Sequence, residues 1–219
     1  MNLSRSIKGS RAIVTGAASG IGRATAWLAA RLGASVVIAG RSEEKLAKTA
    51  DAVNRLIRCD AMSYLVMDIR DPEAVASAVD NVYDSRGKLD ILVNSAGGQF
   101  PQPSIDFSQN GWRSVIDTNL NGTWHMMDYV AKQWKKSGAE GSIVNVVVVG
   151  QGLHGVAHTV AARAGVIAFS EKAAVEWAPY GVRTNCVAPG TVKTEGWQVY
   201  PERTSARYPK TNPMMRAGS

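Results

Sequence analysis

The sequence of 219 residues predicts an α/β fold, a doubly wound parallel sheet with helices on both faces. Short runs of β-branched residues alternate with longer segments of helical pattern from residue 11 to residue 187. The short runs are almost continuously apolar, as is typical of strands that helices cover on both sides. The length suits one well-buried domain, and no repeat or low-complexity linker divides it. We therefore expect a single domain over residues 1–219.

Six segments have the strand pattern. In chain order they are RAIVTG at 11–16, ASVVIAG at 34–40, SYLVMD at 63–68, LDILVN at 89–94, GSIVNVVVV at 141–149 and VRTNCVAPG at 182–190. The segments between them have the helical pattern. They are residues 21–33, 42–57, 72–87, about 110–136 and about 155–177.

The clearest helix boundaries belong to the segment at 72–87. Asp71 directly before Pro72 is a good N-cap and first-turn pair, and Gly87 is a plausible stop. From Pro189 onward the pattern loses its periodicity. We expect residues 189–219 to form a substrate loop or lid, with short helices in it.

Composition and charge exclude several classes of protein. The net charge of +7 arises in residues 1–58, which hold ten Lys and Arg against three Asp and Glu. No arginine-rich run or aromatic platform accompanies these charges, so we expect no nucleic-acid partner. A positive field suits a small molecule that carries phosphate, and a merely solvated surface is the alternative.

No targeting or metal-binding segment is evident. No apolar run approaches the roughly 20 residues of a membrane-spanning helix, and the first residues lack the apolar core of a signal peptide. We therefore expect a cytoplasmic protein without a membrane partner. Cys59 and Cys186 lie far apart, which predicts neither a disulfide framework nor a metal site. Both are expected to be buried as small hydrophobic residues.

The stretch VTGAASGIG at 14–22 follows the first strand and opens the first helix. Gly16 permits a tight turn, Gly20 lets the backbone approach a pyrophosphate, and Gly22 lets helix and strand pack closely. The helix N-terminus adds amide donors and a partial positive charge. The sequence therefore predicts a dinucleotide-binding site.

Three further motifs follow along the chain. After TGAASGIG at 15–22 come NSAG at 94–97, NLNG at 119–122 and PG at 189–190. Together they resemble the short-chain dehydrogenase/reductase family over nearly the whole chain, with Ser95 in place of an asparagine of the NNAG motif. The resemblance implies a Rossmann-type sheet, oxidoreductase activity on a small-molecule substrate, and Asn119 as the active-site asparagine.

The resemblance also implies the residues that contact the cofactor. These are Gly16, Ser19, Gly20, Ile21, Gly22, Asp68, Ile69, Asn94, Ala96, Gly97, Arg163, Pro189, Gly190, Val192 and Thr194. Asp68 and Ile69 correspond to positions beside the adenine, although Asp68 could also be an ordinary turn residue at a strand end.

The end of the second predicted strand bears on the choice of cofactor. A site that prefers NAD places a carboxylate there for the ribose diol, whereas this chain has Gly40 followed by Arg41. Arginine can make paired, charge-assisted hydrogen bonds to a 2′-phosphate. We therefore expect NADP(H) in preference to NAD(H), with a solvated loop charge as the alternative for Arg41.

The catalytic positions depart from the family. HTVAARAG at 158–165 places Thr159 where the family has tyrosine and Arg163 where it has lysine, and Val148 or its neighbour replaces the serine. Threonine is too weak an acid to protonate an alkoxide, and arginine holds its proton at ordinary pH. The candidate catalytic residues Asn119, Thr159 and Arg163 therefore suit a reaction that needs no strong acid.

Conjugate reduction is such a reaction. Hydride delivery to the β-carbon of an unsaturated thioester leaves an enolate, which hydrogen-bond donors can stabilise. Stretches at 97–100, 141–146, 161–166 and 185–190 resemble the subgroup with peroxisomal trans-2-enoyl-CoA and 2,4-dienoyl-CoA reductases. The resemblance implies arginine and a small hydroxyl residue at the two departing positions. We therefore expect NADPH-dependent reduction of an enoyl-CoA-type substrate.

Two other functions stay open. One is a dehydrogenase of a terpenoid or branched alcohol or aldehyde, with water or His158 as the acid. The other is a non-catalytic NADP(H)-binding protein. His154 and His158 flank the suspected pocket, where local hydrogen bonding is their more ordinary role, and Phe100 and Trp197 are candidate pocket walls.

Four tryptophans in helical patterns are expected to be packing residues. They are Trp112, Trp124, Trp134 and Trp177. The family resemblance further implies a homo-oligomer formed through the segments at 110–136 and 155–177. It also implies a final helix and strand that the sequence up to Ser219 does not contain, so we expect a sheet without its final strand.

Overall fold

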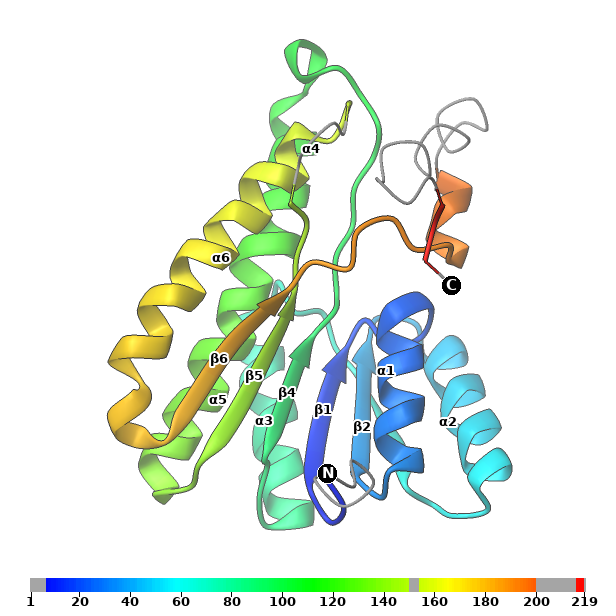
Figure 1. Cartoon of the computed structure of the whole chain (residues 1–219), viewed down its shortest axis with the longest axis vertical. Helices are drawn as coiled ribbons and strands as arrows, with labels where there is room; N and C mark the ends of the chain where they lie inside the picture. Colours follow the sequence, from blue (N-terminus) through cyan, green and yellow to red (C-terminus); the bar gives the residue numbers. More distant parts are fainter. Residues whose placement is uncertain (1–6, 150–153, 200–215, 219) are drawn as a thin grey trace.

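Six parallel strands form one sheet at the centre of the structure, a computed structural model shown in Figure 1. The structure describes residues 7–149, 154–199 and 216–218. The strands are β1 (Arg11–Thr15), β2 (Ser35–Gly40), β3 (Met62–Val66), β4 (Ile91–Asn94), β5 (Gly141–Val146) and β6 (Val182–Val187). Their order across the sheet is β3-β2-β1-β4-β5-β6, so the winding reverses between β1 and β4. The predicted fold class and all six strands are confirmed.

Helices connect the strands and cover the sheet. In the described part of the chain the longer ones are α1 (Gly20–Arg31), α2 (Glu43–Ile57), α3 (Pro72–Arg86), α4 (Gln109–Ile116), α5 (Gly122–Ser137) and α6 (Ala157–Glu176). The short ones are η2 (Ser104–Asp106), the π-helical turn η3 (Asp117–Asn121), η4 (Ala178–Tyr180) and η5 (Glu195–Val199).

The predicted boundaries of α3 are confirmed. The Asp71 side chain accepts hydrogen bonds from the backbone N–H groups of Glu73 and Ala74, and Pro72 occupies the first turn. Gly87 ends the helix with φ 76°, a left-handed conformation that glycine adopts without a steric cost.

Each face of the sheet has its own hydrophobic core. On one face α3, α5 and α6 pack against the strands around Trp134, whose indole N–H donates to the Leu89 carbonyl over 2.7 Å. On the other face α1 and α2 bury residues such as Leu46 and Val53 against β1 and β2. The two cores explain why the strands are apolar on both sides.

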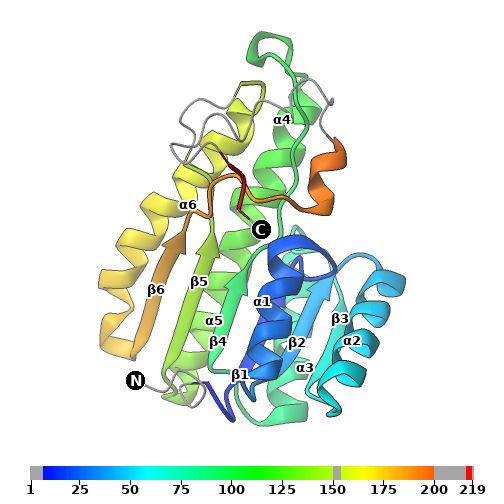
Figure 2. The ribbon, with the colours of Figure 1, turned by 45° about the vertical axis from the view of Figure 1, so that its right-hand side comes forward.

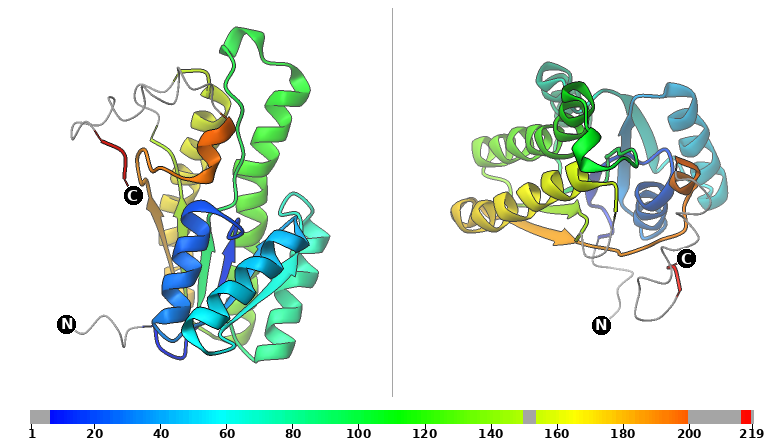
Figure 3. Two further views of the ribbon diagram at one scale, coloured as in Figure 1. Left: turned by 90° about the vertical axis from the view of Figure 1, so that its right-hand side faces the viewer. Right: turned by 90° about the horizontal axis from the view of Figure 1, so that it is seen from above.

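The cover of the second face is incomplete. Figure 3 shows α1 and α2 beside β1 to β3, while α5 and α6 lie on the opposite side of β5 and β6. Val187 on β6 is 47% exposed, and Arg183 and Asn185 on the same strand are exposed as well. Within the described ranges no helix covers β5 and β6 on this side.

Several predicted elements are shorter or less regular than expected; the strand predicted at 182–190, for example, ends at Val187. The strand predicted at 141–149 ends at Val146, since pairing with β6 ends at Val187. The helix predicted at 110–136 is divided by η3 into α4 and α5. The backbone N–H of Gly122 donates to the Asp117 carbonyl, five residues back, so this turn is wider than an α-helical one.

Four residues that the sequence predicts to be buried or packed are exposed or partly exposed. Cys59 is exposed in the loop after α2, and Cys186 is partly exposed because its strand lies at the sheet edge. Trp112 and Trp124 are 39% and 43% exposed on the outer side of their helices. The prediction for Trp134 is confirmed, and Trp177 packs at the border of the first core. Among the described residues, no helix has the length and apolar character that crossing a membrane requires.

Candidate functional site

The turn between β1 and α1 is built on glycines for which no other residue fits. Gly16 has φ 65°, and a Cβ there would lie 2.6 Å from the Ala96 Cα; a Cβ on Gly22 would lie 2.7 Å from the Gly16 carbonyl oxygen. The Thr15 hydroxyl accepts from the backbone N–H groups of Ser95 and Ala96 over 3.2 Å each. These contacts place the α1 N-terminus beside the ends of β1 and β4.

A groove of about 450 Å³ lies over this turn. It opens at the carboxyl ends of the strands, where the sheet order reverses, which is the usual ligand position in such folds. Ser19, the α1 N-cap, makes no side-chain capping bond, and Gly20 has φ 55°. The backbone amides at this helix N-terminus suit a dinucleotide pyrophosphate, and one of them, the Gly20 N–H, donates to the Glu195 carboxylate.

The groove brings together most of the predicted cofactor residues. Those that line it are Gly16, Ser19, Gly20, Ile21, Gly22, Arg41, Asp68, Ile69, Ala96, Gly97 and Thr194. Other lining residues are not among the predicted ones, namely Ala18, Ala39, Gly40, Ser42, Lys45, Met67, Ser95, Thr118, Val146 and Gly196. Several of these residues are next to predicted positions in the sequence, so extending each predicted motif by one residue would have included them.

A larger cavity, of about 820 Å³, lies between the later parts of α1 and α2 and is lined by Trp27, Leu56 and Cys59 among others. It lies toward the amino ends of β2 and β3, away from the glycine turn. We assign the functional site to the smaller groove, because only that groove lies at the carboxyl ends of the strands.

Other predicted cofactor residues lie outside the groove. Asn94 is buried, and its side-chain amide donates to the Asn145 side chain over 2.9 Å. Pro189 and Gly190 are exposed beyond the end of β6, and Val192 forms a β-bridge with Gly218.

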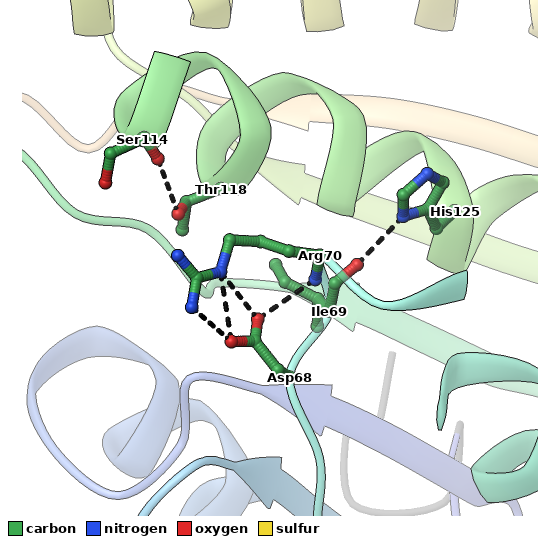
Figure 4. Close-up of polar contacts among 6 residues, drawn as sticks. All are labelled: Asp68, Ile69, Arg70, Ser114, Thr118 and His125. Atoms are coloured by element: carbon green, nitrogen blue, oxygen red, sulfur yellow. Dashed lines mark hydrogen bonds and ion pairs between the residues drawn. The ribbon is translucent and has the colours of Figure 1, made fainter. Parts of the chain in front are cut away.

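Asp68 and Arg70 form a compact ion pair at one end of the groove (Figure 4). The Asp68 carboxylate accepts from the Arg70 backbone N–H and from its Nε, each over 3.0 Å, and from its Nη2. Hydrogen bonding to Arg70 lowers the pKa of Asp68, so the carboxylate stays ionised. The neighbouring Ile69 is buried, and its carbonyl lies 3.0 Å from Nδ1 of His125.

Basic and hydroxyl groups collect where β2 meets α2. Arg41 follows the strand and is exposed, and no described residue hydrogen-bonds or ion-pairs with it. Ser42 is the α2 N-cap, but its hydroxyl makes no capping bond. Lys45 lines the same part of the groove. This end of the groove therefore offers two cations and an open helix N-terminus to an anion.

The candidate catalytic residues Asn119, Thr159 and Arg163 are buried behind Gly97, which lines the groove; none of the three lines the groove itself. Asn119 lies in η3; its Nδ2 donates to the Thr159 hydroxyl over 2.8 Å and to the Gly98 carbonyl over 2.9 Å. Its Oδ1 accepts from the Gly98 N–H over 2.9 Å. The Thr159 hydroxyl also lies 3.4 Å from the Gly98 carbonyl, a long hydrogen bond. Asn119 thus holds the Thr159 oxygen in a fixed place.

Arg163 is a buried cation, 5% exposed. It donates to the Ala96 carbonyl over 2.8 Å, the Asn119 carbonyl over 3.2 Å and the Thr123 hydroxyl over 3.3 Å. Burial lowers its pKa to about 10, which leaves it protonated at neutral pH. A Cβ on Gly97 would meet the guanidinium, so only glycine fits beside it.

The structure does not favour His158 as a proton donor. The side chain is fully buried between Phe107, which stacks on it at 4.5 Å, and Phe100, which meets it edge-on at 4.5 Å. Nδ1 accepts from the Thr159 backbone N–H over 2.8 Å. Burial lowers the pKa of His158, so the ring is neutral and acts in packing.

The remaining candidates are less central. His154 is exposed, and Val148 is partly buried just beyond β5. Phe100 packs on His158 and Phe107 and does not line the groove. The side chain of Trp197 lies outside the part of the chain that the structure describes.

Comparison with known proteins extends these observations. A family model described as short chain dehydrogenase matches residues 10–204. A Bacillus subtilis protein named as a probable 2,4-dienoyl-CoA reductase is 34% identical over 214 residues, covering 94% of this chain and 83% of that protein. A peroxisomal 2,4-dienoyl-CoA reductase of Danio rerio is 37% identical over 194 residues, covering 85% of this chain and 63% of that protein.

Solved structures are similar as well. A citronellol catabolism dehydrogenase of Pseudomonas aeruginosa has 41% sequence identity and a TM-score of 0.83, covering 97% of this chain and 82% of that one.

Replacing Gly97 with alanine should displace Arg163, because the new Cβ would overlap its guanidinium. We expect a loss of about 1–3 kcal/mol in unfolding free energy, the range for overpacking, measured by chemical denaturation. Gly98→Ala is the matched control, since nothing lies within 4 Å of a Cβ at that position. Equal stability of the two variants would contradict this packing argument.

The buried His158 should make stability depend on pH. Its pKa in the folded state is lowered from 6.5, so below that pH the unfolded chain binds more protons. The contribution of neutral His158 to stability should be fully present above pH 6.5. As the pH drops below 6.5, the free energy of unfolding should fall by at most about 1.4 kcal/mol per pH unit. Denaturation at several pH values should show that His158→Phe loses this dependence while His154→Gln, altered at an exposed position, keeps it.

Proposed function

We propose that this chain, which belongs to the short-chain dehydrogenase family and is an oxidoreductase, reduces the carbon–carbon double bond of an enoyl-CoA-type substrate with NADPH. The observation that carries the proposal is Thr159, a hydrogen-bonded hydroxyl group where the family has its tyrosine acid. The two curated relatives described above are named as 2,4-dienoyl-CoA reductases, which supports this substrate class.

The cluster of Asn119, Thr159 and Arg163 suits an enolate better than an alkoxide. A bound nicotinamide cofactor supplies the hydride. The Thr159 hydroxyl donates a long hydrogen bond, of 3.4 Å, to the Gly98 carbonyl. Because this bond is weak, the hydroxyl can instead donate to a substrate oxygen. An enolate needs only such donors, and its carbon can take a proton from water.

The division of work follows from the contacts. Asn119 fixes the position of the Thr159 oxygen, so the donor is oriented before the substrate arrives. Arg163 donates hydrogen bonds to Ala96 and Asn119, and in the proposed role its positive charge lies beside the nicotinamide ribose. Its lowered pKa of about 10 still leaves no proton to relay near neutral pH.

Charge near the adenosine end supports the preference for NADP(H). Arg41 and Lys45 line the groove, and the Ser42 hydroxyl is open. The acid in this part of the groove, Asp68, is already paired with Arg70. A 2′-phosphate would therefore meet positive charge, whereas a bare ribose diol would find no unpaired carboxylate.

A second function is oxidation of a terpenoid or branched alcohol. Its support is the 41% identity with a dehydrogenase named for citronellol catabolism. If the protein binds NADP(H) but turns over none of the substrates, it is a non-catalytic NADP(H)-binding protein.

We also propose a single domain, with residues 189–219 as its substrate loop, and a cytoplasmic homo-oligomer. Trp112 and Trp124 on α4 and α5 and Val175 on α6 expose apolar surface in the segments that the family resemblance implies for contact. Light scattering at micromolar concentration tests the association, and a stable monomer would contradict it.

The Arg41→Ala variant tests the cofactor assignment. We expect it to cost about 1.5–3 kcal/mol of NADPH binding, the range for hydrogen bonds to charged groups, with little change for NADH. Titrations followed by cofactor fluorescence measure both constants. Arg58→Ala is the control, since Arg58 ends α2 at the far end of that helix. Equal affinity of the unmutated protein for NADPH and NADH would rule out the assignment.

The Thr159→Val variant tests the catalytic role. Losing one hydrogen-bond donor of this kind lowers turnover about 10² to 10³-fold, whereas Thr159→Ser should retain most activity. The assay is NADPH oxidation with trans-2-enoyl-CoA and 2,4-dienoyl-CoA thioesters beside simple ketones, and NADP⁺ reduction with terpenoid alcohols. Turnover of alcohols alone would favour the second function.

A further inference from the structure

Glu195 connects the segment after β6 to the first turn of α1. Its Oε2 accepts from the Gly20 backbone N–H over 3.1 Å, and its Oε1 pairs with the Arg23 guanidinium. The partners are more than 170 residues apart in sequence. Figure 2 shows η5 above the start of α1, as these contacts require.

The neighbours of Glu195 face the groove while its own carboxylate turns to α1. Thr194 and Gly196 line the groove, and the Thr194 side chain lies 3.5 Å from where a Gly20 Cβ would be. The contact therefore sets the position of the outer wall beside the pyrophosphate cradle.

Backbone hydrogen bonds also hold the residues just before η5. The Lys193 N–H donates to the Gly218 carbonyl over 3.0 Å, and the Gly218 N–H donates to the Thr191 carbonyl over 2.8 Å. Residues 191–193 are thus held by backbone bonds, whereas η5 is held to α1 by the side chain of Glu195.

We propose that Glu195, paired with Arg23, is a positioning residue that anchors η5 over the pyrophosphate part of the groove and slows release of the dinucleotide. The proposal rests on the cofactor groove assigned above. Arg23 offsets the negative charge of Glu195, which alone would repel a pyrophosphate at the same helix N-terminus.

The exposure of the pair indicates a weak anchor. The two side chains are 46% and 48% exposed, and exposed ion pairs contribute little. Such an anchor can open for cofactor exchange without unfolding the sheet. We therefore expect the pair to affect the dissociation rate of the cofactor and the rate of local opening of η5.

The test is a double-mutant cycle with Arg23→Gln, Glu195→Gln and the double variant. Stopped-flow displacement of NADPH should show each single variant releasing cofactor about two- to fivefold faster, the range that an exposed ion pair supports. The double variant should be no faster than either single one, because all three break one contact. Arg55→Gln, which removes the same charge from the exposed pair with Asp51, is the control.

Slower release or tighter binding in Glu195→Gln would overturn the proposal, since Glu195 would then act only by repelling the cofactor. Additive effects in the double variant would overturn it too. Amide hydrogen exchange over residues 191–198, without added cofactor, supplies an independent readout that should quicken about two- to fivefold in the single variants. If the unmutated protein fails to bind NADPH, the proposed function fails while hydrogen exchange still tests the anchor.

Discussion

The buried guanidinium of Arg163 is the constraint on which the site depends. A desolvated charge must be fully hydrogen-bonded, yet the partners of this one are two backbone carbonyls and a hydroxyl. Those oxygens come from the end of β4, from η3 and from α5, so the position of one side chain on α6 requires three other segments to meet around it. Gly97 follows from the same constraint, because any Cβ there would occupy the space of the guanidinium.

The two ends of the groove are built on opposite principles. At the proposed adenosine end, Arg41 is exposed and makes no hydrogen bond or ion pair with a described residue, so its charge is available to a ligand. At the catalytic end, Asn119 and Thr159 are buried and hydrogen-bonded to each other, so their geometry is fixed in advance. Under the proposed function, selectivity would rest on an exposed charge and chemistry on buried neutral groups held by hydrogen bonds. A change that improves one end therefore need not disturb the other.

The strands, the α3 boundaries and the glycine turn could be predicted because each has a local cause: an apolar run, a capping side chain or a required backbone conformation. The clustering of Asn119, Thr159 and Arg163 came from the family resemblance, and their individual roles stay predictions. What the sequence could not provide depends on distant contacts. His158 is enclosed by rings from a loop some 50 residues earlier, and Glu195 meets α1 across most of the chain. The residue type of Cys59 predicts burial, but the side chain is exposed in the loop after α2.

The π-helical turn η3 has a consequence for how this protein can change its length. In this turn the hydrogen bond spans five residues instead of the four of an α-helix, so the turn contains one extra residue. Deleting any residue from 117–121 would restore regular α-helix and rotate α4 by about 100° against α5, the angle of one residue in a helix with 3.6 residues per turn. Asn119 would then lose its alignment with Gly98 and Thr159 even if every side chain were retained. Along this stretch the number of residues is constrained more firmly than the identity of most of them, so the segment should accept substitution more readily than deletion.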